Sequence, residues 1–179
     1  MKTLVVYTSV HHGNTKKVAE VMAGELEADM VRASDADPAA VGGYDLIGFG
    51  SGIYHNRHHQ NLLRFVDRLL PVGRDLQETI ASMGVDLPFA DQLRPVGGKL
   101  AFIFSTSGRG MVKDHAVLRD LLAMKGFRII GEFACKGWDT YTVREVVGGI
   151  NQGKPDAGDL ARAAGFARDI VKTWQKAAA

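Results

Sequence analysis

The sequence predicts an α/β protein in which a parallel sheet is covered by helices on both faces. Short apolar, β-branched segments alternate along the chain with longer segments whose apolar residues recur at helical spacing. The first segment, 2–7, is apolar at most positions, as expected of a central parallel strand buried on both faces. Alternation of this kind is typical of a parallel sheet whose strands are connected by helices.

Five strands and their helices are expected in order. The strands are placed at 2–7, 30–32, 46–51, 99–105 and 127–133. The helix after the first strand runs to about residue 28, with a buried stripe of Val18, Val21, Met22 and Leu26. The helix after the third strand is expected to bury Leu62, Phe65, Val66, Leu69 and Leu70, and the next helix Val117, Leu118, Leu121 and Leu122. Pro155 and Asp156 open the last helix, whose apolar face carries Leu160, Ala163, Ala167, Ile170, Val171 and Trp174.

Several segments interrupt this alternation. We expect a polar loop with at most a short helix at 34–43, an irregular segment at 52–59 and a long loop at 137–153. We expect residues 71–98 to be an extra segment with a short helix, at whose start Asp75 and Glu78 resemble a capping box, followed by an irregular return. A lid, a dimer arm and a cover over a sheet edge are alternative roles for that segment.

Composition indicates one soluble domain over residues 1–179. Hydrophobic residues make up 46% and charged residues 23% of the chain, which leaves room for a sizeable core. The net charge of +2 is spread along the chain and does not favour a nucleic-acid partner. No apolar run is long enough to span a membrane and no signal region is evident, so a cytoplasmic protein is expected. The single cysteine, Cys135, is interpreted as a buried small residue, and the oligomeric state, including a dimer, stays open.

The junction between the first strand and its helix suits an anion. A helix N-terminus carries free N–H groups and the positive end of the helix dipole, and Ser9, Asn14 and Thr15 add polar side chains around it. Helix capping alone is the competing interpretation of the same residues. The loop lacks the Walker pattern and the three spaced glycines of a dinucleotide site.

Three loops of this kind are expected to converge. Thr8, Ser51 and Ser105 each end a predicted strand, and each is followed by a loop rich in Gly, Ser, Thr or His. In an open parallel sheet, ligands bind beyond the carboxyl ends of the strands, where the strand order reverses. The sequence therefore predicts a pocket at this edge.

At these loops the chain resembles the flavodoxin-like FMN-binding proteins. The resemblance is carried by Tyr7-Thr8-Ser9-Val10-His11-His12-Gly13-Asn14-Thr15, by Gly50-Ser51-Gly52-Ile53-Tyr54 and by Ser105-Thr106-Ser107-Gly108. It implies a flavodoxin-like three-layer sandwich with a five-stranded parallel sheet of order 2-1-3-4-5, for which flavodoxin itself is the standard example. The first loop is one residue longer than in typical flavodoxins, and a His-His pair replaces small residues.

The resemblance also implies the cofactor and its site. The cofactor is FMN, with its phosphate in the first loop and its isoalloxazine between the second and third loops. The implied binding residues are Thr8, Ser9, His11, His12, Gly13, Asn14, Thr15, Gly52, Ile53, Tyr54, His55, Ser105, Thr106, Ser107 and Gly108. Tyr54 is the first candidate to stack on the ring, with Trp138 and Tyr141 as weaker ones.

The implied function is that of a redox protein that carries electrons between a donor and an acceptor. The partner is a redox protein or a small acceptor such as a quinone, and neither a catalytic proton-transfer dyad nor a metal site is expected. An NAD(P)H-dependent flavin or quinone reductase is one alternative, and a cofactor-free binding module on the same fold is another. Typical flavodoxins are strongly acidic, so positive charge on Arg57, His58, His59 or Arg109 is expected to raise the flavin potential here.

Overall fold

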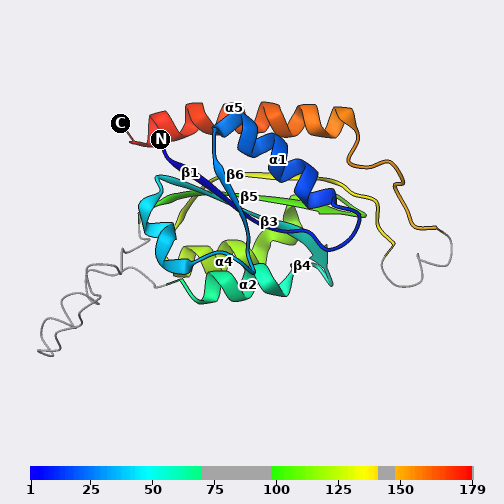
Figure 1. The fold of residues 1–179 in the computed structure, drawn as a ribbon, viewed down its shortest axis with the longest axis horizontal. Helices are drawn as coiled ribbons and strands as arrows, with labels where there is room; N and C mark the ends of the chain where they lie inside the picture. The colour runs from blue at the N-terminus through cyan, green and yellow to red at the C-terminus, as the bar shows by residue number, and fades with distance from the viewer. Residues whose placement is uncertain (70–97, 141–147, 179) are drawn as a thin grey trace, which may run out of the picture.

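The computed structural model describes residues 1–69, 98–140 and 148–178, and it contains a parallel sheet (Figure 1). Its strands are β1 (Thr3–Thr8), β2 (Asp29–Arg32), β3 (Leu46–Tyr54), β5 (Leu100–Ser107) and β6 (Arg128–Lys136). They lie in the order β2-β1-β3-β5-β6, and the short β4 (Arg57–His58) pairs antiparallel with β3. In chain order the five parallel strands thus follow the predicted order 2-1-3-4-5.

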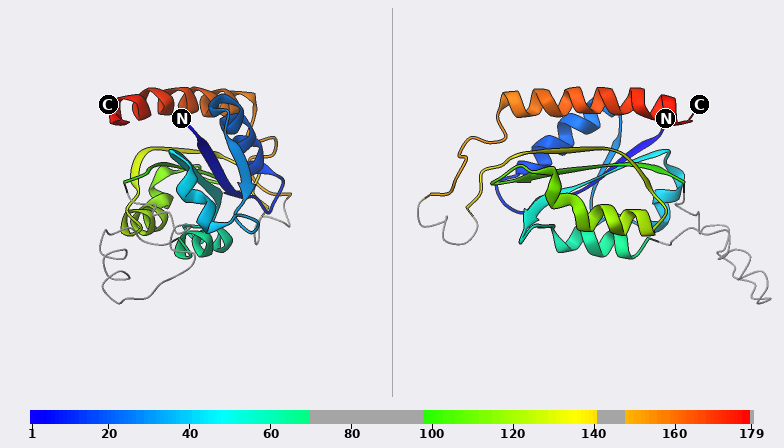
Figure 2. Two further views of the ribbon diagram at one scale, coloured as in Figure 1. Left: turned by 60° about the vertical axis from the view of Figure 1, so that its left-hand side comes forward. Right: turned by 180° about the vertical axis from the view of Figure 1, so that it is seen from behind.

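Helices cover both faces of the sheet, as predicted. On one face lie α1 (Asn14–Leu26) and α5 (Ala157–Ala178), and on the other lie α2 (Gln60–Asp67) and α4 (Ala116–Met124), as Figures 1 and 2 show. Among the described residues, the short 3₁₀ helices η1 (Pro38–Gly43) and η3 (Val112–His115) connect strands to neighbouring elements. The result is a three-layer sandwich.

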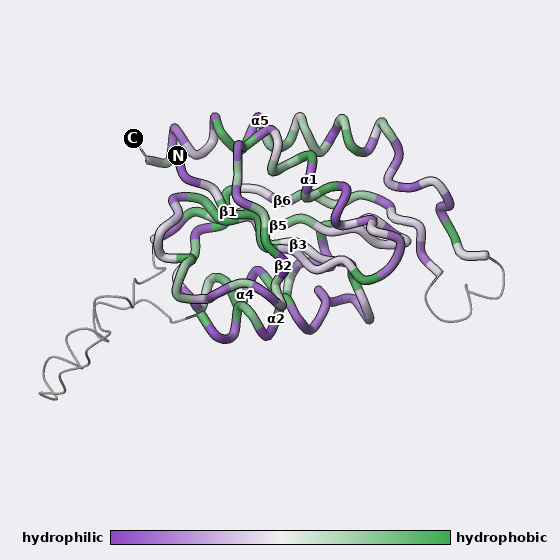
Figure 3. The backbone as a smooth tube through the Cα atoms, viewed as in Figure 1, coloured by the Kyte–Doolittle hydropathy of each residue, from purple (hydrophilic) through white to green (hydrophobic). Residues whose placement is uncertain are grey.

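Alternation along the strands builds one apolar core on each face. Leu4 and Val6 of β1 belong to the core under α2 and α4, whereas Val5 and Tyr7 belong to the core under α1 and α5. All residues of β1 are buried, because strands flank both of its edges and helices cover both of its faces. Figure 3 shows the same pattern as apolar central strands and helices with alternating apolar and polar positions.

Two glycines of β3 admit aromatic rings from β5. A Cβ on Gly48 would lie 2.3 Å from the ring of Phe102, and one on Gly50 would lie 2.1 Å from the ring of Phe104. Both rings are fully buried, so they have no free space into which to move. Close packing of the sheet against α1 and α5 therefore requires glycine at these two positions.

Several strands and helices begin or end at residues other than those predicted. β3 continues to Tyr54 and β5 to Ser107, because their pairing with neighbours extends beyond the apolar run. The last helix begins at Ala157, two residues later than expected. Val117 was expected in the buried stripe of α4 but is 39% exposed, since Leu118 and Leu122 face the sheet instead. The predicted helical segment 71–98 lies outside the described residues, apart from its last residue.

Candidate functional site

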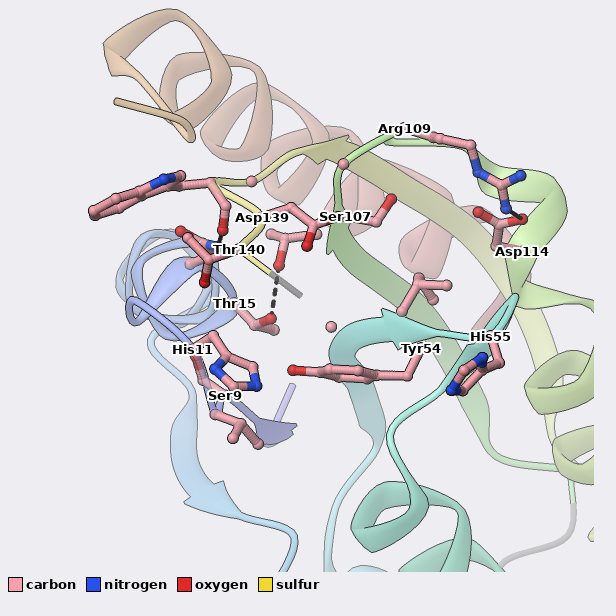
Figure 4. Close-up of a pocket in the computed structure, with 18 of the residues that line it drawn as sticks. Ser9, His11, Thr15, Tyr54, His55, Ser107, Arg109, Asp114, Asp139 and Thr140 are labelled. Carbon is pink, nitrogen blue, oxygen red and sulfur yellow. Dashed lines mark hydrogen bonds and ion pairs between the residues drawn. The ribbon is translucent and has the colours of Figure 1, made fainter. Parts of the chain in front are cut away.

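A pocket of about 430 Å³ lies where β1, β3 and β5 end (Figure 4). Its walls come from four segments of the chain, within 9–15, 52–56, 106–114 and 137–140. β1 has β2 on one side and β3 on the other, so the chain crosses the sheet in opposite directions from this strand. The pocket therefore occupies the topological switch point predicted from the three loops.

The first segment presents the beginning of α1 to the pocket. His12 and Gly13 have left-handed backbones, with φ of 55° and 67°, which turn the chain sharply out of β1. The N–H of Lys17 donates to the Gly13 carbonyl at 3.0 Å, so the helical bonds begin there. The preceding N–H groups of the first turn have no acceptor within the helix. Asn14 and Thr15 of that turn line the pocket.

Two hydroxyls close to this helix start are buried and find no hydrogen-bond partner in the described part of the chain. Thr8 Oγ1 and Ser9 Oγ have no hydrogen-bond partner among the residues that the structure describes, and neither has Asn14 Oδ1. Buried polar atoms normally have a partner, so such atoms beside a pocket mark where a ligand contributes one. Ser9 is itself a lining residue.

Hydrogen bonds tie the first segment to the third and fourth. Thr15 Oγ1 and Thr106 Oγ1 are 2.8 Å apart in a buried contact, and Asn14 Nδ2 donates to the Trp138 carbonyl at 2.7 Å. The ring of His12 stacks on Trp138, with centroids 3.9 Å apart and planes inclined by 21°. These contacts hold the pocket walls in place without a ligand.

The second segment is a β-hairpin. The two-residue turn between β3 and β4 places His55 and Asn56 in left-handed conformations, with φ of 49° and 62°, as in a type I′ turn. The expectation of an irregular segment at 52–59 was therefore wrong, because Ile53 pairs with His58 and Tyr54 with Arg57. Figure 4 shows the Tyr54 ring in the pocket, pointing toward His11, and the two ring centroids are 6.0 Å apart.

The third segment brings a cation to the pocket. Arg109 donates to Asp114 Oδ1 at 2.9 Å and to Asn56 Oδ1, so it links the third segment to the hairpin turn. Ser107 Oγ accepts from the N–H of Gly110. Gly110 has a φ of 63°, a backbone conformation that is strained for residues with a side chain. In Figure 4, Arg109 and Asp114 lie at one side of the pocket, opposite the first segment.

The other three expected cations do not line the pocket. His58 is 2% exposed and its Nδ1 is 2.9 Å from Ser51 Oγ. Burial, and then the nearby His115, hold the pKa of His58 well below 6.5, so this ring is uncharged at neutral pH. His59 caps α2 by accepting from the N–H of Asn61, and partial burial lowers its pKa as well. Positive charge from His58 was thus a wrong expectation.

A second buried histidine belongs to an ordered hydrogen-bonded chain. His115 Nε2 is 2.7 Å from Ser105 Oγ and its Nδ1 is 2.9 Å from Glu132 Oε2. Arg119 donates twice to Glu132, at 2.7 and 2.8 Å. The order serine, histidine, carboxylate is that of a hydrolase triad, but Ser105 is fully buried and does not line the pocket. A substrate has no access to this hydroxyl.

Most of the residues implied for the cofactor are brought together. Those that line the pocket are Ser9, His11, Asn14, Thr15, Gly52, Ile53, Tyr54, His55, Thr106, Ser107 and Gly108. The other four, Thr8, His12, Gly13 and Ser105, do not line the pocket. Thr8 and Ser105 are buried, His12 stacks on Trp138, and Gly13 precedes α1.

Sequence reasoning underrated the fourth segment. Gly137, Trp138, Asp139 and Thr140 all line the pocket, and only Trp138 had been considered, as a weaker stacking candidate. The signal was available, since these residues follow a strand end as the other three segments do. Asn56 and Asp114 also line the pocket, but no pattern in the sequence pointed to them. Tyr141 lies outside the described residues.

Across residues 1–69, 98–140 and 148–178, no group of three His, Cys, Asp or Glu side chains is placed to hold a metal ion. In the same part of the chain no helix is long and apolar enough to cross a membrane. Cys135 is 1% exposed, and burial followed by the nearby Asp159 raises its pKa to about 12. It is the buried small residue predicted.

Fold and pocket together define a doubly wound α/β protein with a ligand site at its switch point. Residues 4–83 match the model of a flavodoxin domain. The uncharacterised protein MJ0298 of Methanocaldococcus jannaschii is 39% identical over 174 residues, which cover 96% of this chain and 99% of that protein. The chain belongs to the flavodoxin family, and it is a flavodoxin-like redox protein.

Solved structures share the fold at low identity. A flavodoxin from the domain Archaea has a TM-score of 0.65 at 16% identity, with 98% of this chain and 99% of that chain covered. Oxidised flavodoxin 2 from Bacillus cereus has a TM-score of 0.59 at 17% identity, with 96% and 99% covered. Rubredoxin oxygen:oxidoreductase from Desulfovibrio gigas matches 99% of this chain with 37% of its own, at a TM-score of 0.62 and 14% identity.

Proposed function

We propose that this chain binds FMN in the pocket and carries electrons between a donor and an acceptor, either a redox partner protein or a small molecule such as a quinone. The observation that supports this most is the start of α1 at the end of β1, where two buried hydroxyls lack partners among the described residues. A phosphate in the pocket supplies oxygen acceptors for the Ser9 hydroxyl and for the N–H groups of the first helical turn that have no acceptor within the helix.

The phosphate site needs no cationic side chain. α1 is 13 residues long, and its N-terminus carries the positive end of the helix dipole. Ser9, which lines the pocket, would donate its hydroxyl hydrogen to a phosphate oxygen. Thr15 is already engaged with Thr106, so its side chain braces the site and its backbone N–H remains for the ligand.

The rest of the pocket fits a flat aromatic ring system. Tyr54 and Trp138 supply aromatic surfaces at the lining, and Gly52 and Gly108 add no side chain to it. When bound, FMN supplies the one- and two-electron chemistry. The chain binds and orients the ring and limits its contact with water. Arg109, the cation of the lining, favours negative charge there and raises the potential.

Absorption and titration test the cofactor. Protein purified without added flavin should show flavin absorption bands, and apoprotein should quench the fluorescence of added FMN on binding. Ser9→Ala removes one phosphate donor and should weaken FMN binding roughly 10- to 100-fold, the value of a hydrogen bond to a charged group. Ser34→Ala, in an exposed turn that does not line the pocket, is the matched control.

Riboflavin, which lacks the phosphate, separates the two parts of the site. It should bind more weakly than FMN to the wild-type chain, and Ser9→Ala should leave its affinity unchanged. A protein that is colourless and ignores added FMN refutes the proposal. In that case the cofactor-free binding module becomes the better account of the pocket.

The electron source distinguishes a carrier from an enzyme. Under the proposal, FMN in the holoprotein is reduced by dithionite or by a partner protein, and only slowly by NADPH alone. Rapid bleaching of the flavin by NADPH alone would instead identify an NAD(P)H-dependent reductase. We further propose that residues 1–179 form one domain, which predicts a single cooperative unfolding transition for the full chain.

A further inference from the structure

A buried pair of histidines lies directly behind the pocket, and the proposed function does not use it. Ser51 of β3 and Ser105 of β5 are paired in register at the carboxyl ends of their strands, and both are fully buried. The next residue on each strand, Gly52 and Thr106, lines the pocket.

Each of these serines contacts one histidine. His58 Nδ1 lies 2.9 Å from Ser51 Oγ, and His115 Nε2 lies 2.7 Å from Ser105 Oγ. The two imidazole rings are themselves in contact, with centroids 5.1 Å apart. Both side chains are almost completely shielded from water, with exposures of 2% for His58 and 0% for His115.

His115 has partners for both of its charge states. In the neutral ring, Nδ1–H donates to Glu132 Oε2 at 2.9 Å and Nε2 accepts from the Ser105 hydroxyl. Once Nε2 takes a proton, Ser105 needs only to turn its hydroxyl hydrogen away and accept. Both N–H groups of the charged ring then have an oxygen acceptor, so a proton is accommodated without moving the backbone.

His58 does not have hydrogen-bond partners for both of its charge states within the described part of the chain. Ser51 Oγ donates its hydrogen to the Gly52 carbonyl, so Nδ1 of His58 carries the hydrogen of that contact. Nε2 of His58 is buried and has no hydrogen-bond partner within the described part of the chain. A second proton on this ring would be left without an acceptor, which is costly in a buried site. His115 is therefore the ring of the pair that can take up charge.

The charged groups around His115 come from every element packed on it. Glu132 of β6 is its direct partner, Arg119 of α4 neutralises part of that carboxylate, and His58 of β4 opposes a second positive charge. Asp114 of η3 favours a charged His115, although Arg109 partly compensates that carboxylate. Burial outweighs these attractions and lowers the pKa of His115, which leaves the ring neutral until further negative charge arrives nearby.

That negative charge has a source in the pocket. Asp114 and Thr106, which flank His115 and its partner Ser105 in sequence, both line the pocket. We propose that the His115–Glu132 pair is a buried proton-binding site that takes one proton from water when the cofactor in the pocket gains negative charge. The inference rests on the proposed function, since the charge arrives with electrons on a bound FMN.

Charge and atoms balance in this step. An external reductant, dithionite in the test below, gives up one electron to the pocket and is itself oxidised. One proton from a hydronium ion bonds to Nε2 of His115 and leaves a water molecule, so the added charges of −1 and +1 in the protein cancel. No covalent bond of the chain breaks. Glu132 and Arg119 reach the surface, with side chains 18% and 39% exposed, and they connect the site to solvent.

Proton NMR of the imidazole C–H groups reads His115 directly, without any measurement of activity. In the apoprotein, His115 should titrate reversibly while the chain remains folded. Glu132→Gln should lower its proton affinity roughly tenfold, because the ring loses its anionic partner. Glu25→Gln is the matched control, since Glu25 also pairs with an arginine, Arg168 at 2.8 Å, but on the opposite face of the sheet.

The holoprotein tests the response to charge. Reduction by dithionite should raise the proton affinity of His115 at least about threefold relative to oxidised holoprotein. The midpoint potential of the wild-type protein should fall as the pH rises, by up to 59 mV per pH unit when one proton is taken up per electron. The midpoint potential of His115→Gln should fall less steeply with pH. Should His115→Gln fail to fold, Glu132→Gln serves for the same potential measurement.

Each outcome decides one claim. A His115 that stays neutral until acid unfolds the apoprotein overturns the proton site, whether or not FMN binds. A holoprotein that forms, but whose His115 titrates identically in both redox states, overturns the coupling and leaves the proposed function standing. Failure to bind any FMN overturns the proposed function and the coupling together, and the apoprotein titration still decides the proton site.

Discussion

The two buried histidines should make the stability of this fold depend steeply on pH. An unfolded histidine takes up a proton near pH 6.5, whereas burial lowers the pKa of both His58 and His115 in the folded chain. Below pH 6.5 the unfolded state therefore binds more protons than the folded state, and stability falls as the pH falls. Each histidine contributes roughly 1 to 1.5 kcal/mol per pH unit until the pH reaches its folded pKa.

The two contributions end at different pH values. His115 keeps a carboxylate partner and its pKa is lowered, whereas that of His58 is lowered well below 6.5. We expect the two contributions to add while both folded histidines stay neutral, and the slope to decline to that of His58 alone once His115 takes up its proton. The lowered pKa of Glu132, whose usual value is 4.5, affects stability only at lower pH.

Urea unfolding of the apoprotein between pH 7.5 and 5, followed by tryptophan fluorescence, measures this slope. His58→Gln should remove about half of it, because glutamine keeps an amide near Ser51 but takes up no proton. His11→Gln is the control, since His11 is exposed and meets water in both states. A free energy of unfolding that is constant from pH 7.5 to 5, or a His58→Gln slope equal to that of wild type, would refute the reasoning.

Three further predictions concern packing, a buried hydrogen bond and the thiol. Gly50→Ala should destabilise the fold by roughly 2 kcal/mol or more in thermal melts, because its Cβ would lie 2.1 Å from a buried ring of β5. Gly24→Ala in α1, where a Cβ meets nothing within 4 Å, should stabilise it by about 0.5 to 1 kcal/mol. Thr15→Val or Thr106→Val alone should cost about 1 to 3 kcal/mol in urea unfolding by leaving one buried hydroxyl unpaired, and the double variant should cost less than the sum. Cys135, buried and with a pKa raised to about 12, should react with a thiol reagent at pH 8 only after urea unfolds the chain.

The contrary results are equally definite. A Gly50→Ala variant as stable as Gly24→Ala would mean that β3 and β5 pack differently. Strictly additive losses at Thr15 and Thr106 would mean that the two hydroxyls are not partners. Rapid labelling of native Cys135 would mean that the carboxyl end of β6 is open to solvent.

The fold was predictable because each strand and helix is signalled by its own residues. Segment 2–7 is apolar enough to identify a central strand, and Leu62, Phe65 and Val66 repeat at helical spacing on α2. The switch-point rule then places the site without side-chain detail. Eleven of the fifteen implied residues line the pocket for that reason.

The features that were missed depend on contacts between distant residues. The hairpin at His55 and Asn56 lacks the Asn-Gly or Asp-Gly pair that usually signals a type I′ turn. His58 resembled a surface cation in a His- and Arg-rich segment, yet the pairing of β4 with β3 turns it into the protein interior. The hydrogen bond between His115 and Glu132 joins residues that are 17 positions apart and lie in different elements, so no local sequence pattern predicts it.

The contacts of Trp138 with the first loop determine when the pocket can close during synthesis of the chain. Asn14 donates to the Trp138 carbonyl, and His12 stacks on its ring, so the wall at the first loop is completed by a residue near position 140. During synthesis the first loop leaves the ribosome more than a hundred residues before this partner does. A nascent chain therefore has β1 and α1 long before it has a closed pocket, and capture of a ligand there becomes a late event, after most of the sheet has emerged.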